Sequence, residues 1–380
     1  MNTKRAPKVR FKGFTDAWEQ RKLEALVDVC SGRDYKHLTE GDIPVYGTGG
    51  YMLSVSEALS YDKDAIGIGR KGTIGKPYIL NAPFWTVDTL FYAIPKEKVD
   101  LNFAFAIFQN INWKKKDEST GVPSLSRTAI NEIHILVPQY DEQQALGQLF
   151  YGIDRLITLH QRKLDKMKEL KKTFLNLIFS QKLRFRGFTD SWELRKLGEI
   201  TEKITRKNQS LESLLPLTIS AQHGLIDQNS FFNKQIASKD VSGYYLIKNG
   251  EFAYNKSYSN AYPWGAIKRL DLHDKGVLST LYIVFKPTNV ESNFLVSYYS
   301  ADNWHKEVSI RAAEGARNHG LLNISPQDFF ETKLLIPNKY EEQEKIGVFF
   351  KKLDNLIIFN QDKINRLKNV KKILLRNMLI

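Results

Sequence analysis

A glycine-rich stretch at residues 64–80, DAIGIGRKGTIGKPYIL, has side chains that could bind phosphate or nucleobases. A nucleotide-binding P-loop is excluded by spacing, because Arg70 stands where the first glycine before Gly75-Lys76 is required. It is also excluded by chemistry, because Pro77 replaces the Ser or Thr that would hold magnesium. The stretch instead predicts a flexible loop suited to phosphates or base edges in a groove, or else an ordinary charged surface loop. The cations of this loop are Arg70, Lys71 and Lys76.

Other polar loops have side chains of the same kind. The segment IPVYGTGGY contains Gly47, Gly49 and Gly50, where the backbone must bend or approach another group closely. Near residue 317, an Arg-Asn pair is notable because Arg can bond guanine in two places and Asn can do the same for adenine. A further cluster interleaves cations with aromatic and amide side chains: Lys256, Tyr258, Asn260, Trp264, Lys268 and Arg269. None of these loops identifies a ligand in isolation.

The patterns of known active sites are missing from the sequence. It has no HExxH, no calcium-loop pattern and no GxSxG. It also lacks the Asn/Asp-Pro-Pro-aromatic motif of amino-methylating enzymes and a glycine-rich methyl-donor site. The histidines are scattered, so we do not expect zinc, and we interpret these as structural or surface residues: His37, His134, His223, His273 and His305. The sequence therefore gives no sign of a catalytic site, and we do not expect a metal site.

The elements that must position these loops occur twice. Two leaders, Arg10–Leu23 and Arg184–Leu197, read RFKGFTDAWEQRKL and RFRGFTDSWELRKL. Each is followed by a variable segment and then by a long helical segment that begins YDEQQ or YEEQE. We expect Asp16-Ala-Trp18 and Asp190-Ser-Trp192 to serve as helix caps and packing elements that fasten the leaders. This order predicts a pseudo-twofold molecule in which one repeated scaffold carries two unlike binding segments.

Residues 142–180 and 342–380 lack proline and repeat apolar residues at heptad spacing. At about 1.5 Å per residue, each helix would span roughly 55–60 Å. A twofold axis perpendicular to the helices would make them antiparallel. We place these residues in the seam: Leu146, Leu149, Ile153, Leu156, Met167, Leu170, Phe174 and Leu177, with Ile157, Leu164 and Ile178 beside them; and Ile346, Phe349, Leu353, Leu356, Leu367, Val370 and Leu374, with Phe350, Ile357, Ile364 and Met378 beside them.

Polar residues interrupt the stripe at the same place in both helices. His160 and Asn360 take a-type positions near the middle, and Lys163 and Lys363 follow at the d-type positions. Buried polar residues in a seam can fix register at a cost in stability. We hypothesise that His160 and Asn360 approach each other and fix the register. The alternative is two independently solvated residues at a loose crossing.

Charge and composition narrow the class of protein. The net charge is +14, of which the scaffold segments 1–22, 141–186 and 341–380 carry +5, +5 and +4. The variable segments 24–140 and 198–340 carry −2 and +2, so any grip on nucleic acid there must come from local clusters. The basic helices could equally be solvated charged faces. A single cysteine and the lack of an apolar span or secretory signal predict a cytoplasmic protein without a membrane.

The paired leaders GFTDAWEQRKL and GFTDSWELRKL, and helix entries such as PSLSRTAINEIHILVPQYDEQ, resemble the specificity subunit of type I restriction–modification enzymes. The resemblance covers essentially the whole chain. It implies an α+β fold with two similar mixed α/β target recognition domains, separated by two long antiparallel coiled-coil helices in a pseudo-twofold arrangement. The implied divisions are a leader with the first recognition domain at 1–141, the central helix at 142–183, a leader with the second domain at 184–341, and the C-terminal helix at 342–380.

The same resemblance implies function and partners. Each recognition domain would read one half of an asymmetric, bipartite double-stranded DNA target, and the helices would act as a ruler. The subunit itself would have no catalysis and no cofactor. Its implied partners are two methyltransferase subunits and restriction/translocase subunits. The residues implied as DNA contacts are Tyr46, Thr48, Gly49, Arg70, Lys71, Thr73, Lys76, Ser124, Ser126 and Arg127 in the first domain, and Lys256, Tyr258, Asn260, Lys268, Arg269, Arg317, Asn318 and His319 in the second.

Three alternatives remain open on sequence grounds. The first is a stand-alone DNA-binding protein or regulator that reads a bipartite site without methyltransferase partners. The second is a coiled-coil interaction hub, which predicts no salt-dependent binding to any duplex. The third is a self-contained enzyme, which the missing motifs disfavour.

Overall fold

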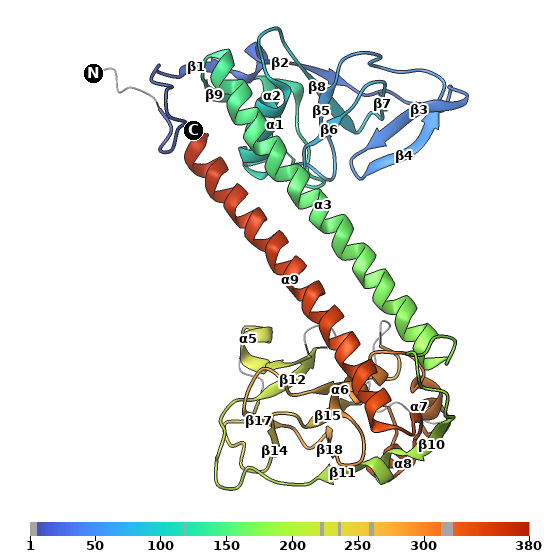
Figure 1. The fold of residues 1–380 in the computed structure, drawn as a ribbon. Coiled ribbons are helices and arrows are strands. Elements are labelled where there is room, and N and C mark those ends of the chain that lie inside the picture. The colour runs from blue at the N-terminus through green and yellow to red at the C-terminus, as the bar shows by residue number, and fades with distance from the viewer. Residues whose placement is uncertain are drawn as a thin grey trace. The chain divides into compact units, whose positions relative to one another are not determined.

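The computed structural model describes residues 6–117, 119–220, 224–234, 237–257, 262–312 and 322–379. The chain forms two compact units (Figure 1). Unit 1 contains residues 1–163 and 360–380, and unit 2 contains residues 164–359. Each unit therefore holds one variable segment and one half of each long helix. Among the described residues, no helix combines the length and apolar character needed to cross a membrane.

Unit 1 is built on a four-stranded antiparallel sheet with the order β2-β8-β5-β6. A smaller sheet has the order β4-β3-β7, and the leader strand β1 pairs antiparallel with β9. The elements are β1 (Glu19–Lys22), β2 (Val27–Ser31), β3 (Glu40–Gly47), β4 (Gly50–Val55), β5 (Ala65–Gly69), β6 (Tyr78–Leu80), β7 (Trp85–Thr86), β8 (Leu90–Pro95), α1 (Leu101–Asn110), α2 (Arg127–Asn131), β9 (His134–Val137) and the first half of α3 (Tyr140–Phe179), with short 3-10 turns at Leu23–Ala25 and Trp113–Lys116.

Unit 2 repeats this plan with different loops. Its main antiparallel sheet has the order β11-β18-β15-β16, and β10 pairs with β19 as β1 pairs with β9. The elements are β10 (Trp192–Lys196), α4 (Leu197–Ile200), β11 (Thr201–Ile204), β12 (Leu217–Ser220), β13 (Gly224–Asp227), α5 (Gln228–Phe232), β14 (Tyr245–Lys248), β15 (Phe252–Asn255), β16 (Ala266–Arg269), β17 (Lys275–Leu278), β18 (Ile283–Pro287), α6 (Ser292–Tyr298), α7 (His305–Arg311), α8 (Pro326–Phe330), β19 (Lys333–Pro337) and α9 (Tyr340–Met378). The matching strand orders confirm the prediction of two similar mixed α/β domains.

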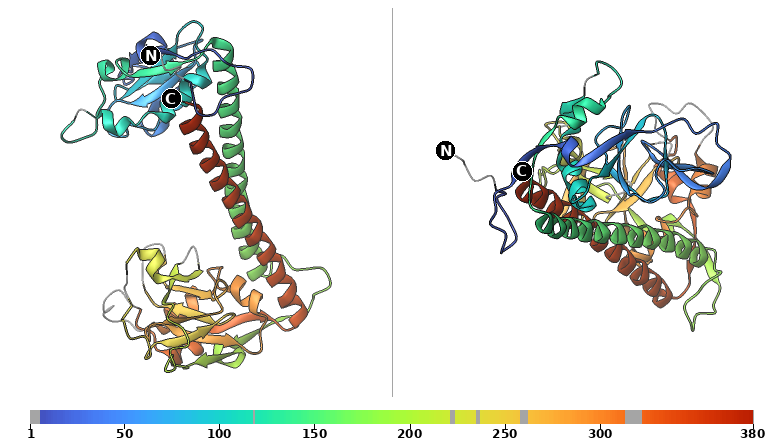
Figure 2. Two further views of the ribbon diagram at one scale, coloured as in Figure 1. Left: turned by 90° about the vertical axis from the view of Figure 1, so that its left-hand side faces the viewer. Right: turned by 90° about the horizontal axis from the view of Figure 1, so that it is seen from above.

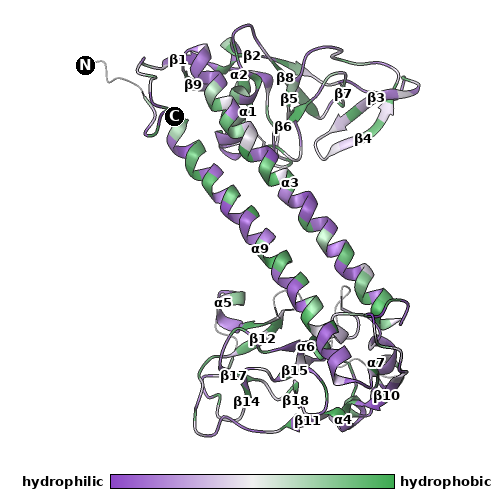
Figure 3. Ribbon diagram, viewed as in Figure 1, coloured by the Kyte–Doolittle hydropathy of each residue, from purple (hydrophilic) through white to green (hydrophobic). Residues whose placement is uncertain are grey.

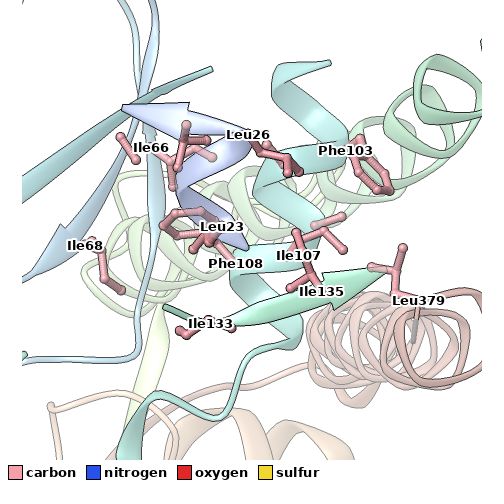
Figure 4. Close-up of a cluster of buried hydrophobic side chains, with 14 of the residues drawn as sticks. Leu23, Leu26, Ile66, Ile68, Phe103, Ile107, Phe108, Ile133, Ile135 and Leu379 are labelled. Carbon is pink, nitrogen blue, oxygen red and sulfur yellow. The ribbon is translucent and has the colours of Figure 1, made fainter. Parts of the chain in front are cut away.

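The core of unit 1 joins the sheet, α1 and the ends of both long helices. Leu23, Ile66, Phe103 and Phe108 are fully buried at its centre, and Leu379 reaches it from the end of α9 (Figure 4). Burial of such side chains contributes roughly 1.5–3 kcal/mol each. The unit 2 core is richer in rings, with Tyr254 stacked on Phe329 at a centroid distance of 4.7 Å.

The leaders are fastened by buried ion pairs. In unit 1, Arg10 donates from Nε and Nη2 to the two oxygens of Glu142, at 2.7 Å each. The indole Nε1 of Trp18 donates to the same carboxylate at 3.2 Å. In unit 2, Arg184 donates to Glu342 in the same bidentate way, at 3.0 and 2.7 Å. Thus the Glu that directly precedes the Gln of each helix entry binds the leader of its own unit.

The Gln that follows each of these Glu residues ties the helix to a neighbouring turn. Gln143 donates to the carbonyl of Pro138 at 3.0 Å, and Gln343 donates to that of Pro337 at 2.9 Å. The Gln343 side-chain oxygen also accepts from the amide of Glu291 at 2.9 Å. These contacts give the Glu-Gln pair of the repeat a structural role.

One local prediction was right only in part. Trp18 and Trp192 pack in the cores of their units, as expected. No helix begins at Asp16 or Asp190, because each leader continues into a strand; Asp190 instead accepts from Lys339 at 2.8 Å. The apolar run at residues 84–94 forms two strands, because a turn closed by the Leu90 amide and the Val87 carbonyl separates β7 from β8.

The long helices pack antiparallel within each unit. In unit 1, the first turns of α3 lie beside the last turns of α9 (Figures 1 and 2), and Asp154 pairs with Lys371 at 2.5 Å. In unit 2, Lys171 pairs with Asp354 at 2.5 Å, and Phe174 meets Phe349 edge-on at 5.3 Å. The two ion pairs occupy equivalent positions of the repeat.

The seam lies one residue away from part of the predicted stripe. Leu164 and Ile178 are buried, whereas Leu156 and Leu170 are 47% and 43% exposed. Hydrophobic residues recur along both helices (Figure 3), because each helix has two apolar rows with the same heptad period. Periodicity could not tell the rows apart. The row that is buried or half-buried throughout α3 contains Phe150, Ile157, Leu164, Lys171 and Ile178.

The same register alters the prediction for the polar pair. Ile153 lies next to Asp154, which pairs with Lys371. Because the helices are antiparallel, moving seven residues forward along α3 corresponds to moving seven residues back along α9. His160, seven residues after Ile153, therefore lies beside Ile364, seven residues before Lys371. Ile364 is fully buried, and His160 Nδ1 is buried without a hydrogen-bond partner among the described residues. We therefore propose that His160 faces an apolar residue instead of Asn360.

Candidate nucleic-acid interface

In unit 1, two of the loops singled out in the sequence meet around a cavity of about 310 Å³. Lys71 forms an isolated antiparallel bridge with Ser124. The amide of Leu125 donates to the carbonyl of Arg70 at 2.9 Å. These backbone contacts make the two loops one surface. The cavity is lined by Ser31, Arg70, Lys71, Phe91, Ser124, Leu125, Ser126 and Arg127.

Arg70 is held by both its backbone and its side chain. Its amide donates to the carbonyl of Thr89 at 2.8 Å. Its Nη1 donates to the carbonyl of Asp88 at 3.4 Å, and its guanidinium carbon lies 5.6 Å from the ring centroid of Phe91, a cation–π distance. Throughout the described segments, no carboxylate lies within ion-pair distance of Arg70, Lys71 or Arg127. The cavity therefore presents positive charge that these segments do not neutralise.

The glycine-rich loop folds back on itself instead of cradling a phosphate. Gly72 and Gly75 have φ of +80° and +86°, which favour glycine. A Cβ on Gly69 would clash with the carbonyl oxygen of Thr73, so the turn depends on the missing side chain. Thr73 and Lys76 remain exposed on the outer side of this turn.

The serine-rich loop is organised by its own hydrogen bonds. Asp117 accepts from the amide of Ser124 at 3.0 Å and from the hydroxyl of Ser119 at 2.8 Å. The bond from Ser124, followed by those from Ser119, lowers the pKa of Asp117. Ser126 accepts from the amide of Ala129 at 3.0 Å and caps α2, which leaves Arg127 exposed as the first residue of that helix.

The loop predicted at Tyr46 to Gly50 is shorter in the structure, because Tyr46 and Gly47 end β3 and Gly50 begins β4. The ring of Tyr46 lies edge-on to Tyr51 at 6.4 Å. The carbonyl of Tyr46 accepts from Val87 at 3.0 Å. Since Thr89 holds Arg70 two residues further on, the hairpin and the cavity border the same short segment. Thr48 and Gly49 occupy the hairpin tip.

In unit 2, Lys256 is directed inward. Its Nζ donates to the carbonyl of Ile324 at 3.3 Å, and burial lowers its pKa. It lines a small cavity of about 40 Å³ together with Lys203, Tyr245 and Tyr282. This cavity is too small for a nucleobase, so Lys256 serves first to join its loop to the segment before α8.

Arg269 and Lys268 lie where local packing uses them. Arg269 donates to Asp271 at 2.6 Å, to Ser292 at 2.7 Å and to Asn293 at 3.1 Å, and its side chain is 12% exposed. Burial, followed by the nearby charge of Lys171, lowers the pKa of Lys268. These surroundings favour structural roles for both residues. The remaining candidates lie outside the described residues: Tyr258, Asn260, Arg317, Asn318 and His319.

Sequence reasoning missed the aromatic floor of the unit 1 cavity. Phe91 belongs to an apolar run and gave no polar signal, yet strand pairing places it opposite Ser31 and Ile68 in the sheet. It also missed Lys207, whose Nζ lies 3.9 Å from the ring centroid of Tyr245. The alternation of side chains in β8 could have indicated which face of the sheet Phe91 occupies. It could not have indicated that Arg70 lies against its ring.

Comparisons with known proteins agree with one another, because each finds specificity domains or subunits of type I restriction systems. Residues 15–169 match the type I restriction modification DNA specificity domain. The type I restriction enzyme MjaVIII specificity subunit of Methanocaldococcus jannaschii is 23% identical over 207 residues, which are 45% of this chain and 47% of that protein. The match thus spans about half the length of that relative. The C-terminus of a putative type I specificity subunit from Mycoplasma pneumoniae is 24% identical over 148 residues, which are 39% of this chain and 95% of that protein.

A solved structure has the same fold. The S subunit of a type I restriction–modification system from M. genitalium superposes with a TM-score of 0.69 at 16% identity, over 99% of each chain. The resemblance expected from the leaders and helix entries is therefore confirmed.

Proposed function

We propose that this chain is the DNA-recognition subunit of a type I restriction–modification complex, because residues 15–169 match the type I restriction modification DNA specificity domain. It has no catalytic role of its own, and adenine methylation and DNA cleavage belong to partner subunits. Each unit reads one half of an asymmetric bipartite target. The antiparallel helices set the spacing, and readers about one DNA turn apart would be roughly 34–36 Å from each other.

The cavity of unit 1 is the observation that carries the DNA-binding proposal. Arg70, Lys71 and Arg127 converge there without a carboxylate partner in the described segments. A half-buried cation without a counterion favours an anionic or strongly accepting ligand, and a DNA duplex offers phosphates and base edges together. The stand-alone regulator stays as the second candidate, because the cavity does not depend on partner subunits.

We expect that replacing Lys71 or Arg127 by Ala weakens binding to all duplexes by a similar factor. If each side chain neutralises one phosphate, the slope of log K against log salt should fall by about 1 per residue. The measurement is a titration of the full chain with duplex DNA at several salt concentrations.

The control is Lys98→Asn, beyond the opposite end of β8 from Phe91, where φ of +59° suits Asn. It removes the same charge and should leave the slope unchanged. An equal change in all three variants would contradict a local interface, and a wild type without salt-dependent binding would refute DNA recognition altogether.

The second apolar row of the long helices supports docking of two partner subunits. If the buried row of α3, with Ile157 and Lys171, and its counterpart in α9 are taken as a positions, the residue before each of them is a g position. In an antiparallel pair, the g positions of both helices lie on the same side. In unit 1 these are Leu156 and Val370, each 47% exposed, and in unit 2 they are Leu170 and Leu356, 43% and 52% exposed. Exposed apolar rows of this kind mark interaction sites. Two equivalent patches fit two copies of one methyltransferase subunit.

Accordingly, the double variant Leu156→Glu/Val370→Glu should bind one methyltransferase subunit where the wild type binds two. The pair Leu170→Glu/Leu356→Glu should do the same, and the quadruple variant should bind none. Mass measurement of the purified complexes reads the stoichiometry. Tyr151→Glu, on the outward b position of α3 and 54% exposed, is the control and should leave two bound. Two partners bound to the quadruple variant would place docking elsewhere.

A further inference from the structure

The three cations of the unit 1 cavity differ in burial and in how firmly their side chains are fixed. This difference points to different roles in binding DNA. Arg70 is half-buried, with its backbone fixed on both sides by Thr89 and Leu125. Lys71 and Arg127 are exposed at the rim. A side chain that reads a base edge must be oriented, whereas a phosphate contact tolerates a mobile cation.

The guanidinium of Arg70 is supported on one face and one edge. Phe91 lies beneath it at 5.6 Å, and the carbonyl of Asp88 accepts from Nη1 at 3.4 Å. Nε and Nη2 make no hydrogen bond to any part of the chain that the structure describes. These two donors are adjacent on the planar group, so the free edge can donate two parallel hydrogen bonds.

The rest of the lining limits the base that this edge can meet. The cavity contains no Asn or Gln, which would pair with adenine, and no Asp or Glu, which would accept from cytosine, among the described residues. Its serines accept and donate without preference. Guanine presents two acceptors, O6 and N7, on its major-groove edge, and a bidentate Arg is their usual partner.

We propose that Arg70 reads the O6 and N7 of one guanine in the first half-site, while Lys71 and Arg127 contact flanking phosphates. This proposal rests on the DNA-recognition function above and names the base to which unit 1 is specific. Arg269 is the structural contrast in unit 2, since its guanidinium is already bound by Asp271, Ser292 and Asn293.

The test is selection of bound duplexes from a randomised pool by the full chain with its partner subunits, for the wild type, Arg70→Ala and Lys71→Ala. In the wild type, one position of the first half-site should be G·C. Arg70→Ala should reduce the preference for that pair by roughly 5- to 150-fold and leave every position of the second half-site unchanged. Lys71→Ala should weaken binding without changing any preference. Because the bonds that fix Arg70 to Thr89 and Leu125 are made by its backbone, the alanine variant keeps them.

Three outcomes would overturn the assignment. One is uniform weakening by Arg70→Ala with an intact G·C preference, which would make Arg70 a phosphate contact. Another is a wild-type first half-site without any selected G·C pair. The third is an Arg70→Ala effect on both half-sites. If instead the wild type selects no sequence at all, the proposed function itself fails, which is a separate result.

Discussion

Replacing Glu142 by Gln should destabilise unit 1 by about 3–5 kcal/mol, the usual cost of leaving a buried charge without its partner. The side chain of Glu142 is 2% exposed and accepts from Arg10 and Trp18 together. An amide offers a single acceptor oxygen and no charge, so the guanidinium of Arg10, whose side chain is only 14% exposed, would lose its ion pair. The loss should appear in chemical unfolding and as faster hydrogen exchange in β1 and β9, where the leader joins the sheet.

Two matched variants make this prediction specific. Glu342→Gln breaks the equivalent pair with Arg184 and should destabilise unit 2 by a similar amount. Glu19→Gln breaks the pair between Glu19 and Arg21, which are 58% and 51% exposed, and should cost less than about 1 kcal/mol. A loss from Glu142→Gln no larger than that from Glu19→Gln would show that the buried pair does not fasten the leader.

Replacing Gly347 by Ala should destabilise unit 2 by about 2–3 kcal/mol, although alanine is the better helix former. A Cβ there would lie 2.6 Å from the amide nitrogen of Phe294 and 2.5 Å from Oε2 of Glu291. Glu291 caps α6 by accepting from that same amide at 2.6 Å. The backbone of the helix start would have to move, and the cap would be strained or lost.

The same substitution should have the opposite effect at Gly152. That glycine lies in α3 with nothing within 4 Å of its would-be Cβ, so Gly152→Ala should stabilise by about 0.5–1 kcal/mol. Gly147→Ala should be destabilising, because its Cβ would clash with Oδ1 of the α1 cap Asp100. Thermal unfolding of the three variants measures both signs. Stabilisation by Gly347→Ala would refute the close approach of α6 to α9.

The repeat carried most of what the sequence could predict of the fold. Leaders and helix entries recur because each unit packs its leader against the start of its long helix, with Glu142 and Glu342 in equivalent ion pairs. What periodicity could not decide was which of two apolar rows forms the seam. Lys171 looks like a surface residue in sequence, yet it lies in the buried row because Asp354 of the partner helix neutralises it. Such a choice depends on the other helix, which one segment cannot reveal.

The candidate site was predictable in composition but not in geometry. The convergence of Arg70 with Ser124 and Arg127 follows from a β-bridge between loops distant in sequence. The contrast between Arg70 and Arg269 also needed the structure, since both are cations among aromatic residues. Asp271 is a sequence neighbour of Arg269, but Ser292 and Asn293 belong to α6 and bind Arg269 only in the folded unit.

The most direct test of the two-reader account is the DNA motif methylated in cells that express this chain together with the proposed methyltransferase subunits, read genome-wide by sequencing that detects methyladenine. The account predicts one asymmetric motif, with two unlike half-sites separated by a fixed number of unread base pairs. A contiguous motif, two identical half-sites, or no methylation beyond that of cells lacking the chain would contradict it.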